Sequence, residues 1–218
     1  MALTPIVVAY AVLGLVVGLI ADRLSARWPA HEEGPHAGGR VRSRDWRTIV
    51  LTLGGAAAFA ALAGRWTEPR DLAILSVYFA ALLVLMATDL DQKLLPDVIT
   101  LPLIVVALVL TVTGTNPLLA GKDLPIASAL MAGIGAPVLL FGLDVVVKGA
   151  LGMGDLKLVA GLGLMSGVTR LFSGLVVASI ASAALLIVLI VAHRLTMKTA
   201  IPFGPILILG GILAALAP

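Results

Sequence analysis

Long uninterrupted apolar runs constrain this chain more than any other feature of its sequence. Of its 218 residues, 60% are hydrophobic and only 12% are charged, and the mean hydropathy is +1.11. Soluble domains carry about 25% charged residues, so no water-soluble core accounts for this composition. The runs are continuous rather than alternating, which indicates membrane-spanning helices and not a barrel. We therefore expect an all-α, polytopic helical membrane protein.

Apolar runs of about 20 residues match the thickness of the hydrocarbon core of a bilayer. By this criterion we expect about eight transmembrane helices, at residues 4–22, 47–64, 71–89, 97–114, 125–147, 154–168, 170–193 and 200–217. No basic residue precedes the first run, so we predict a helix that stays and not a cleaved signal peptide. The helices would form one integral-membrane domain over residues 1–218, with a short cytoplasmic loop at 23–46 and the core at 71–217.

The basic residues are unevenly distributed among the loops. With the N-terminus outside, the inside loops hold Arg23, Arg27, Arg40, Arg42, Arg44, Arg47, Lys93, Lys148, Lys157, Arg194 and Lys198, and the outside loops hold Arg65, Arg70, Lys122 and Arg170. Cytoplasmic loops are enriched in Lys and Arg, so this orientation is favoured. The same residues account for the net charge of +3 without a nucleic-acid partner. We interpret loop 23–46 as a solvated, topology-setting loop, with lipid-headgroup binding as its alternative.

Several kinds of chemistry are excluded or disfavoured by residue type. The chain has no cysteine, which excludes disulfides, thiolate catalysis and Cys-ligated zinc. The histidines, His31, His36 and His193, are divided between one loop and a helix end, so we expect neither a metal site nor a cofactor. Glycines such as Gly55 and Gly163 are interpreted as helix-packing residues, because small side chains let backbones approach closely in lipid.

Two aspartates at the ends of apolar runs are the candidate catalytic residues. Asp89 closes the run Leu72–Thr88, and Asp155 stands in a Gly-x-Gly-Asp sequence just before another run. An ionisable group at the bilayer boundary costs roughly 2–4 kcal/mol on insertion scales and marks a functional site by default. The predicted orientation places both acids on the cytoplasmic side. Two carboxylates at equal depth can share a proton, as in aspartic proteases.

The acidic residues of these segments also have structural interpretations. Asp155 can cap a helix after a glycine turn and gain from the helix dipole, while the glycines also leave room for an extended substrate strand. Asp97 can favour the start of the next span after Pro96. Asp91 is expected in a loop, where a solvated carboxylate costs little.

On these residues the chain resembles the type IV prepilin peptidases, the GxGD family of membrane aspartic proteases (peptidase family A24). The first family motif corresponds to Asp89 followed by Pro96-Asp97 and Thr100-Leu101-Pro102, the second to Gly152, Gly154, Asp155, Lys157 and Leu158, and a late Pro-Phe-Gly-Pro to residues 202–205. The first span is similar more loosely, through Gly14, Gly18 and Arg27. Many bacterial members also carry a cytoplasmic domain with two Cys-x-x-Cys pairs, which this chain lacks.

The resemblance implies an aspartic endopeptidase that removes the leader of a prepilin or pseudopilin at the cytoplasmic membrane face, in a type IV pilus or type II secretion system. Asp89 and Asp155 would be catalytic, and Gly152, Gly154, Lys157, Pro96 and Asp97 would support the site or bind substrate. One carboxylate would activate water while the other protonates the substrate, without a metal. Because the cysteine-rich domain is absent, we expect cleavage without efficient N-methylation.

An ion-coupled transporter or channel that uses the intramembrane acids is the main alternative. It would account for Asp144, which can instead pair with Lys148 on the same helix face. It does not account for the loop motifs, and the sequence shows no convincing internal repeat. A catalytically inactive scaffold of the same fold is a third possibility, against which the presence of both acids argues. The individual substrate, the oligomeric state and the division of acid and base roles stay open.

Overall fold

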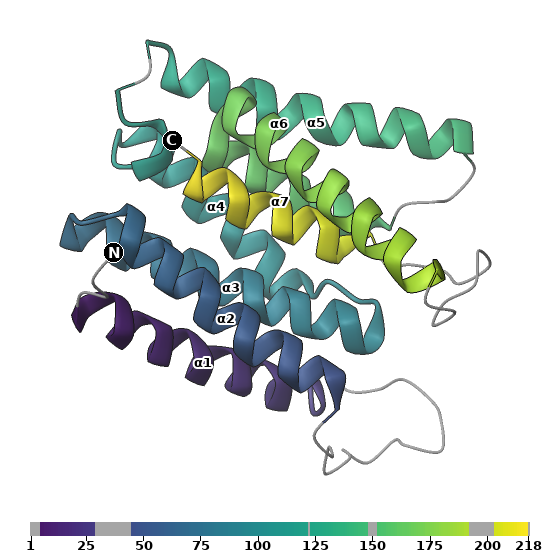
Figure 1. The fold of residues 1–218 in the computed structure, drawn as a ribbon. Coiled ribbons are helices and arrows are strands. Elements are labelled where there is room, and N and C mark those ends of the chain that lie inside the picture. Colours follow the sequence, from purple (N-terminus) through teal and green to yellow (C-terminus); the bar gives the residue numbers. More distant parts are fainter. Residues whose placement is uncertain (1–4, 29–44, 122, 148–151, 192–202, 218) are drawn as a thin grey trace. The chain divides into compact units, whose positions relative to one another are not determined.

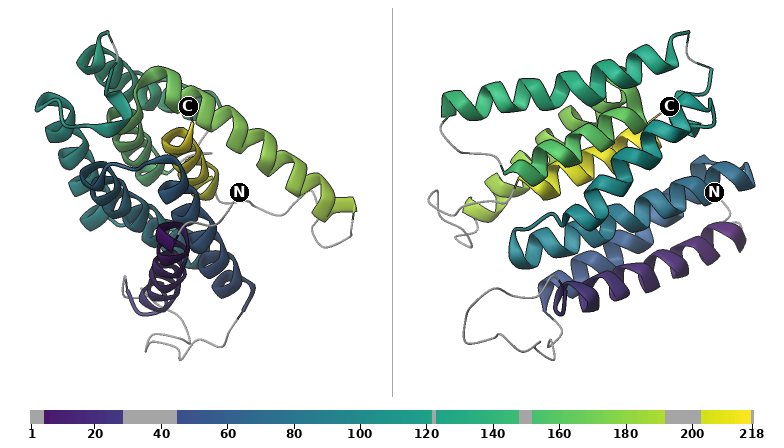
Figure 2. Two further views of the ribbon diagram at one scale, coloured as in Figure 1. Left: turned by 60° about the vertical axis from the view of Figure 1, so that its left-hand side comes forward. Right: turned by 180° about the vertical axis from the view of Figure 1, so that it is seen from behind.

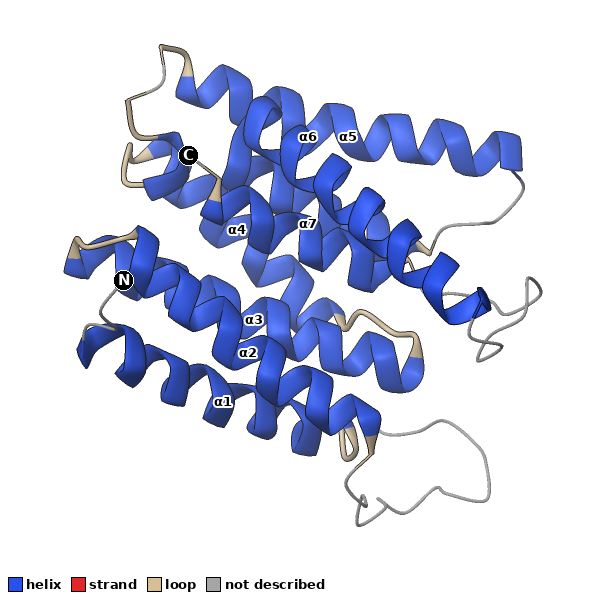
Figure 3. Cartoon of the chain, viewed as in Figure 1, coloured by secondary structure: helices blue, strands red, loops and turns tan. Residues whose placement is uncertain are grey.

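The computed structural model describes residues 5–28, 45–121, 123–147, 152–191 and 203–217. Within these ranges the chain forms seven α-helices and one short 3₁₀ helix, joined by loops (Figure 3). They are α1 Pro5–Ser25, α2 Trp46–Arg65, α3 Pro69–Gln92, α4 Asp97–Val112, η1 Pro117–Leu119, α5 Pro125–Val147, α6 Met153–Val191 and α7 Gly204–Leu216. The prediction of an all-α fold is confirmed.

Five of the described helices are long and apolar enough to cross a membrane: α1, α2, α3, α5 and α6. Helices α4 and α7 are apolar but shorter. On α5, the side chains of Leu139 and Val146 are both 77% exposed. Large apolar side chains exposed along a whole helix are stable against lipid and not against water. The chain is therefore a polytopic membrane protein.

The helix count differs from the prediction at one place. The predicted spans 154–168 and 170–193 both fall within α6, which consists of two helical segments joined at a break at Gly167 (φ 68°, ψ 177°). This positive φ is favourable for glycine and costly for other residues. At the break, the N–H of Val168 donates to Ser128 Oγ at 3.1 Å. The predicted boundary thus marks a real change of backbone direction, and the seven labelled helices of the described residues include both predicted spans under the one label α6.

The helices pack into two compact units, residues 1–103 and 104–218, and the boundary falls inside α4. In the first unit α1, α2 and α3 lie against one another (Figure 1). In the second unit α6 packs against both α5 and α7 (Figure 2). That these units act together as one membrane domain stays a prediction.

Close backbone contact and aromatic packing hold the first unit together. A Cβ atom placed on Gly14 of α1 would lie 2.2 Å from the carbonyl oxygen of Gly55 on α2, so this crossing accepts no larger residue. This confirms the packing role predicted for Gly55. Phe59 of α2 and Phe79 of α3 make an edge-to-face pair with ring centroids 6.1 Å apart. Both rings are buried, which fixes α2 against α3.

Three basic residues predicted in outer loops lie instead in helices: Arg65 ends α2, Arg70 lies in the first turn of α3, and Arg170 lies well inside α6. Arg170 belongs to α6, three residues after the break at Gly167. Its Nη1 donates to the carbonyl oxygens of Ala214 at 3.3 Å and Ala217 at 2.6 Å, at the C-terminal end of α7. A guanidinium group at a helix C-terminus satisfies carbonyl groups that have no partner within the helix. Arg170 therefore ties α7 to α6 within the second unit.

Candidate active site

Asp89 lies in the last turn of α3 and is 5% exposed, beside the fully buried Thr88. The helix continues beyond the predicted end of the span at residue 89 and stops at Gln92. Lys93 then adopts the left-handed conformation (φ 55°, ψ 38°), and its N–H donates to the carbonyl oxygen of Asp89 at 2.9 Å. This capping bond ends the helix within one turn after Asp89. A buried position keeps the Asp89 carboxylate away from lipid.

The prediction that Asp91 lies in a solvated loop is wrong. Asp91 belongs to the last turn of α3, its side chain is 15% exposed, and it forms a salt bridge with Nη1 of Arg47 on α2. The next residue, Gln92, donates from Nε2 to the carbonyl oxygen of Ser25 on α1 at 3.0 Å. These two contacts join the end of α3 to both neighbouring helices. The error arose because sequence pattern cannot show which side of a helix end meets another helix.

Pro96 and Asp97 form the start of α4. The carbonyl oxygen of Pro96 accepts the N–H groups of Ile99 at 3.0 Å and Thr100 at 3.1 Å, which begins the helix. Asp97 is exposed in the first turn, as expected for an acid that favours a helix N-terminus. Thr100 is fully buried and its hydroxyl also bonds to the Pro96 carbonyl, at 3.3 Å. The first motif is therefore a helix end, a short loop and a helix start.

Asp155 lies in the first turn of α6 and is half-buried. Its Oδ2 accepts the N–H of Gly152 at 3.1 Å, and its own N–H donates to the Gly152 carbonyl at 3.0 Å. The Asp155 carboxylate thus makes one half of a capping box, in which the side chain of the third helical residue accepts the N–H of the N-cap residue; the other bond uses the Gly152 backbone carbonyl, because glycine has no side chain. Asp155 thus lies at the start of a helix as predicted, but it is the third helical residue, and Gly152 holds the N-cap position that was predicted for Asp155. The carboxylate is oriented by its own turn.

The other residues of the second motif differ in how far they are exposed. Gly152 is exposed, whereas Gly154 and Lys157 are partly exposed. Leu158 is fully buried. A Cβ atom on Gly152 would lie 3.5 Å from Asp155 Oδ2, an ordinary contact, so the folded chain itself has space for a side chain there.

The late motif starts α7, and its first residue, Pro202, lies outside the described residues. The carbonyl oxygen of Phe203 accepts the N–H groups of Ile206 at 3.1 Å and Leu207 at 3.3 Å, and Pro205 stands in the first turn. Proline is favoured there because this turn has no helical acceptor for its missing N–H. The motif therefore has a local structural role as a helix start.

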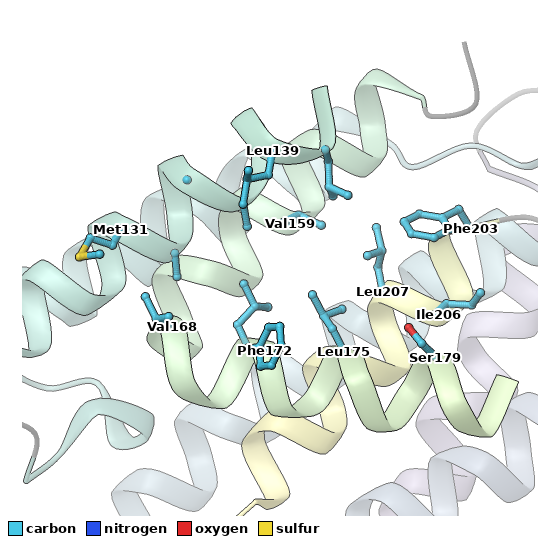
Figure 4. A pocket seen from close by; sticks show the side chains of 15 residues that line it. Met131, Leu139, Val159, Val168, Phe172, Leu175, Ser179, Phe203, Ile206 and Leu207 are labelled. Atoms are coloured by element: carbon cyan, nitrogen blue, oxygen red, sulfur yellow. The ribbon is translucent and has the colours of Figure 1, made fainter. Parts of the chain in front are cut away.

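An apolar cavity of about 490 Å³ lies among α5, α6 and α7 in the second unit (Figure 4). Its lining includes Leu139, Phe172, Phe203 and Val159, which is one helical turn after Asp155. Among the lining residues only Ser179 carries a polar side chain. A hydroxyl group alone supplies no acid–base pair, so the cavity is not itself a catalytic centre.

The predicted site residues are divided between the two units. Asp89, Pro96 and Asp97 belong to the first, and Gly152, Gly154, Asp155 and Lys157 belong to the second. The pairing of Asp89 with Asp155 stays a prediction. No three acidic or histidine side chains gather as metal ligands within the described ranges. Lys148, the predicted partner of Asp144, and His31, His36 and His193 lie outside those ranges.

One buried acid was missed by the sequence reasoning. Asp22 of α1 is 0% exposed, and its Oδ2 accepts the hydroxyl hydrogen of Thr48 on α2 at 2.8 Å. It follows the first apolar run in the same way that Asp89 follows the third. An acid at a bilayer boundary indicates a functional site, and Asp22 meets this criterion at the end of its span as Asp89 does.

Comparison with known sequences places these motifs in a family. Residues 76–190, which include Asp89 and Asp155, match the profile of the type IV leader peptidase family. A protein of Dickeya chrysanthemi is 29% identical over 228 residues, covering 91% of this chain and 77% of the relative. One of Burkholderia pseudomallei is 34% identical over 179 residues, covering 79% and 57%, and one of Legionella pneumophila is 33% identical over 167 residues, covering 77% and 55%.

All three relatives are named prepilin leader peptidase/N-methyltransferase. The chain spans about three quarters of the first relative and little more than half of the other two. No solved structure matches it. Because the matched family segment covers more than half of its 218 residues, this chain belongs to the type IV leader peptidase family, a family of aspartic peptidases.

Proposed function

We propose that this protein removes the leader from type IV prepilin-like proteins at the cytoplasmic membrane face, with Asp89 and Asp155 as its catalytic pair. One observation carries the proposal: the family segment 76–190 contains two acids that each stand where an apolar helix meets a loop. Asp89 closes α3 and Asp155 opens α6. An acid at such a boundary stands next to the aqueous phase while its helix remains in the membrane.

The proposed reaction is peptide hydrolysis by a pair of carboxyl groups. The ionised member takes a proton from a water molecule, whose oxygen attacks the scissile carbonyl carbon. The protonated member donates to the carbonyl oxygen, and a proton then passes to the leaving amine as the C–N bond breaks. Two neighbouring carboxylates share one proton because two adjacent negative charges repel, so the pair titrates as a unit. Either aspartate can serve as the base in this scheme.

The proposed substrate follows from the names of the relatives and from the second motif. The relatives act on prepilins by name, and a prepilin or pseudopilin is the corresponding substrate here. Gly152 is exposed beside Asp155 and has no side chain, which leaves its backbone open to an extended substrate segment. Lys157 is partly exposed two residues after Asp155, where it supports substrate binding in this proposal.

The cytoplasmic location of the site is also part of the proposal. It is supported by the predicted distribution of Lys and Arg, with eleven on the inside and four on the outside. An inner-membrane protein in this orientation would meet the leader before its substrate is assembled outside. Membrane lipid would surround the exposed apolar faces of α5.

The test is cleavage of a prepilin-like substrate by purified protein in lipid nanodiscs. Asp89→Asn and Asp155→Asn should each lower kcat/KM by about 1,000-fold or more, because either one removes the shared proton. Asp71→Asn is the matched control, since Asp71 lies in the first turn of α3, at the other end of the helix that carries Asp89. It should stay within about 2-fold of the wild type, as surface substitutions usually do. Retention of a tenth of the activity by either site variant would remove that acid from the mechanism.

Methyl transfer, which the names of the relatives include, is expected to be inefficient here. The chain contains no cysteine and so cannot form the Cys-ligated domain of bifunctional members. The measurement is incubation of the protein with S-adenosylmethionine and a prepilin substrate, followed by mass spectrometry of the product. A stoichiometric gain of one methyl group at the new N-terminus would contradict this prediction.

A further inference from the structure

Three side-chain contacts join α1, α2 and α3 at the end of the first unit that holds Asp89. The hydroxyl of Thr48 donates to Asp22 and joins α2 to α1, at 2.8 Å. Gln92 donates to the Ser25 carbonyl and joins α3 to α1, at 3.0 Å. The salt bridge of Arg47 with Asp91 joins α2 to α3. We call these three contacts the three-helix clamp, because each joins a different pair of the three helices.

Most polar groups of the three-helix clamp are shielded from bulk water. Asp22 and Ser25 are fully buried, Thr48 is 6% exposed, and the side chains of Arg47 and Asp91 are 28% and 15% exposed. Hydrogen bonds in such surroundings are costly to break, because a separated partner stays buried without water. The three helix ends are therefore held to one another and cannot move apart independently.

The start of α2 fixes the positions of two clamp residues, Arg47 and Thr48. Oδ1 of Asp45, the N-cap residue, accepts the N–H groups of Arg47 at 3.0 Å and Thr48 at 3.2 Å. These bonds hold the first helical turn, from which the Arg47 and Thr48 side chains project. Two of the three clamp contacts thus start from one capped turn.

The clamp acts on the turn that carries Asp89. Asp91 and Gln92 follow Asp89 by two and three residues, and α3 ends at Gln92. The ends of helices open more readily than their centres, so a carboxylate three residues from a helix end needs outside support to keep one position. The contact of Asp91 with α2 and the contact of Gln92 with α1 supply this support.

We propose that the three-helix clamp is a positioning device that holds the Asp89 carboxylate in its productive place. The inference rests on the proposed function, since it assigns Asp22, Thr48, Arg47, Asp91 and Gln92 a role in the proposed cleavage. None of them is a catalytic residue; they act through the last turn of α3. Displacement of a reacting group by about 1 Å can cost on the order of 100-fold in rate, so loosening this turn should lower kcat more than it changes substrate binding.

The test compares paired substitutions in nanodisc-embedded protein by kcat, KM and thermal unfolding. Thr48→Val removes the donor to Asp22 but keeps the shape of the side chain, and Thr48→Ser restores the hydroxyl. We expect Thr48→Val to lower kcat by about 10-fold with KM within about 2-fold, and Thr48→Ser to recover most of that loss. Gln92→Glu, which removes the N–H donor at a partly exposed position, should behave like Thr48→Val and serves if Thr48→Val does not fold.

Substitutions in the salt bridge give a second test, in which a double variant can restore the lost contact. Arg47→Asp and Asp91→Arg should each lower kcat, and the double variant, which exchanges the two charges, should regain part of it. The matched control is Ser76→Ala, because the Ser76 hydroxyl bonds to the Leu72 carbonyl at 2.6 Å within α3, several turns from Asp89. Its kcat should stay within about 2-fold of the wild type.

Three results would overturn the clamp proposal. They are unchanged kcat in Thr48→Val and Gln92→Glu, equal losses in Thr48→Val and Thr48→Ser, or losses that match the decrease in folded protein. Wild-type and Asp89→Asn protein run in parallel: a wild type without cleavage, or an active Asp89→Asn variant, would count against the proposed function itself. An active wild type with fully active clamp variants would count against the clamp alone.

Discussion

The two candidate catalytic acids are held in place in different ways. Asp89 is 5% exposed, and the turn that carries it is joined to two other helices by side chains. Asp155 is half-buried, and the bond to its carboxylate comes from Gly152, three residues earlier in the same turn. The position of Asp89 thus depends on how three helices pack, whereas the orientation of Asp155 is set by its own sequence neighbours.

This difference has a consequence for how each acid responds to change. A local turn persists as long as its own few residues are kept, because its bonds close over a short stretch of chain. A turn held by tertiary contacts responds to substitutions on distant helices, since each contact contributes to its position. Remote variants should therefore affect Asp89 more than Asp155.

The largest expected effect is the loss of activity when the catalytic acids are replaced. It shows whether the two acids act as one unit although they are held in place differently. The double variant Asp89→Asn/Asp155→Asn should retain about as much activity as either single variant, because the loss of one member already removes the shared proton. The measurement is residual kcat/KM for a prepilin-like substrate, quantified by mass spectrometry. A double variant about 100-fold less active than both single variants would show that the acids contribute independently.

An intermediate effect is expected in the accessibility of the two acidic turns. The chain has no native cysteine, so single cysteines can replace Thr88, which is 0% exposed beside Asp89, and Gly152, which is exposed beside Asp155. A membrane-impermeant maleimide should label position 152 at least about 30-fold faster, since labelling of a buried site requires local opening.

Labelling in detergent-denatured protein, where the two rates should agree, is the control. Inverted and right-side-out vesicles also report the side of the membrane, and position 152 should react only from the cytoplasmic side. Equal labelling rates in the folded protein would mean that the turns of Asp89 and Asp155 do not differ in accessibility.

The smallest expected effect tests the local support of Asp155. Gly152→Pro removes the N–H that donates to Asp155 Oδ2, and we expect kcat to decrease about 10-fold, near the lower end of the value of one hydrogen bond to a charged group. Gly152→Ala keeps the N–H and its Cβ makes an ordinary contact at 3.5 Å, so its kcat should stay within about 3-fold. A rise of KM alone in Gly152→Ala would show that the absence of a side chain at Gly152 leaves room for the substrate. Full activity in Gly152→Pro would mean that this bond does not position Asp155.

Sequence patterns located the helices and the local turns well, because these depend on residues close together in the chain. The start of α4 at Asp97 and the first-turn position of Asp155 follow from proline, glycine and acidic residues at helix ends. The boundary predicted near residue 169 lies close to the break at Gly167. Asp91 was misplaced, because its partner, Arg47, is 44 residues away.

The amino-acid sequence by itself determined the membrane class of this protein, its apolar spans and the motifs that assign its family, since composition and short-range spacing are properties of the chain alone. Only the tertiary structure decided that Asp22 is buried, that Asp91 pairs with Arg47, and that Gln92 meets Ser25, 67 residues earlier. The physical reason is that each of these contacts joins separate helices. Which faces meet depends on packing along their whole length, including the close approach of Gly14 and Gly55.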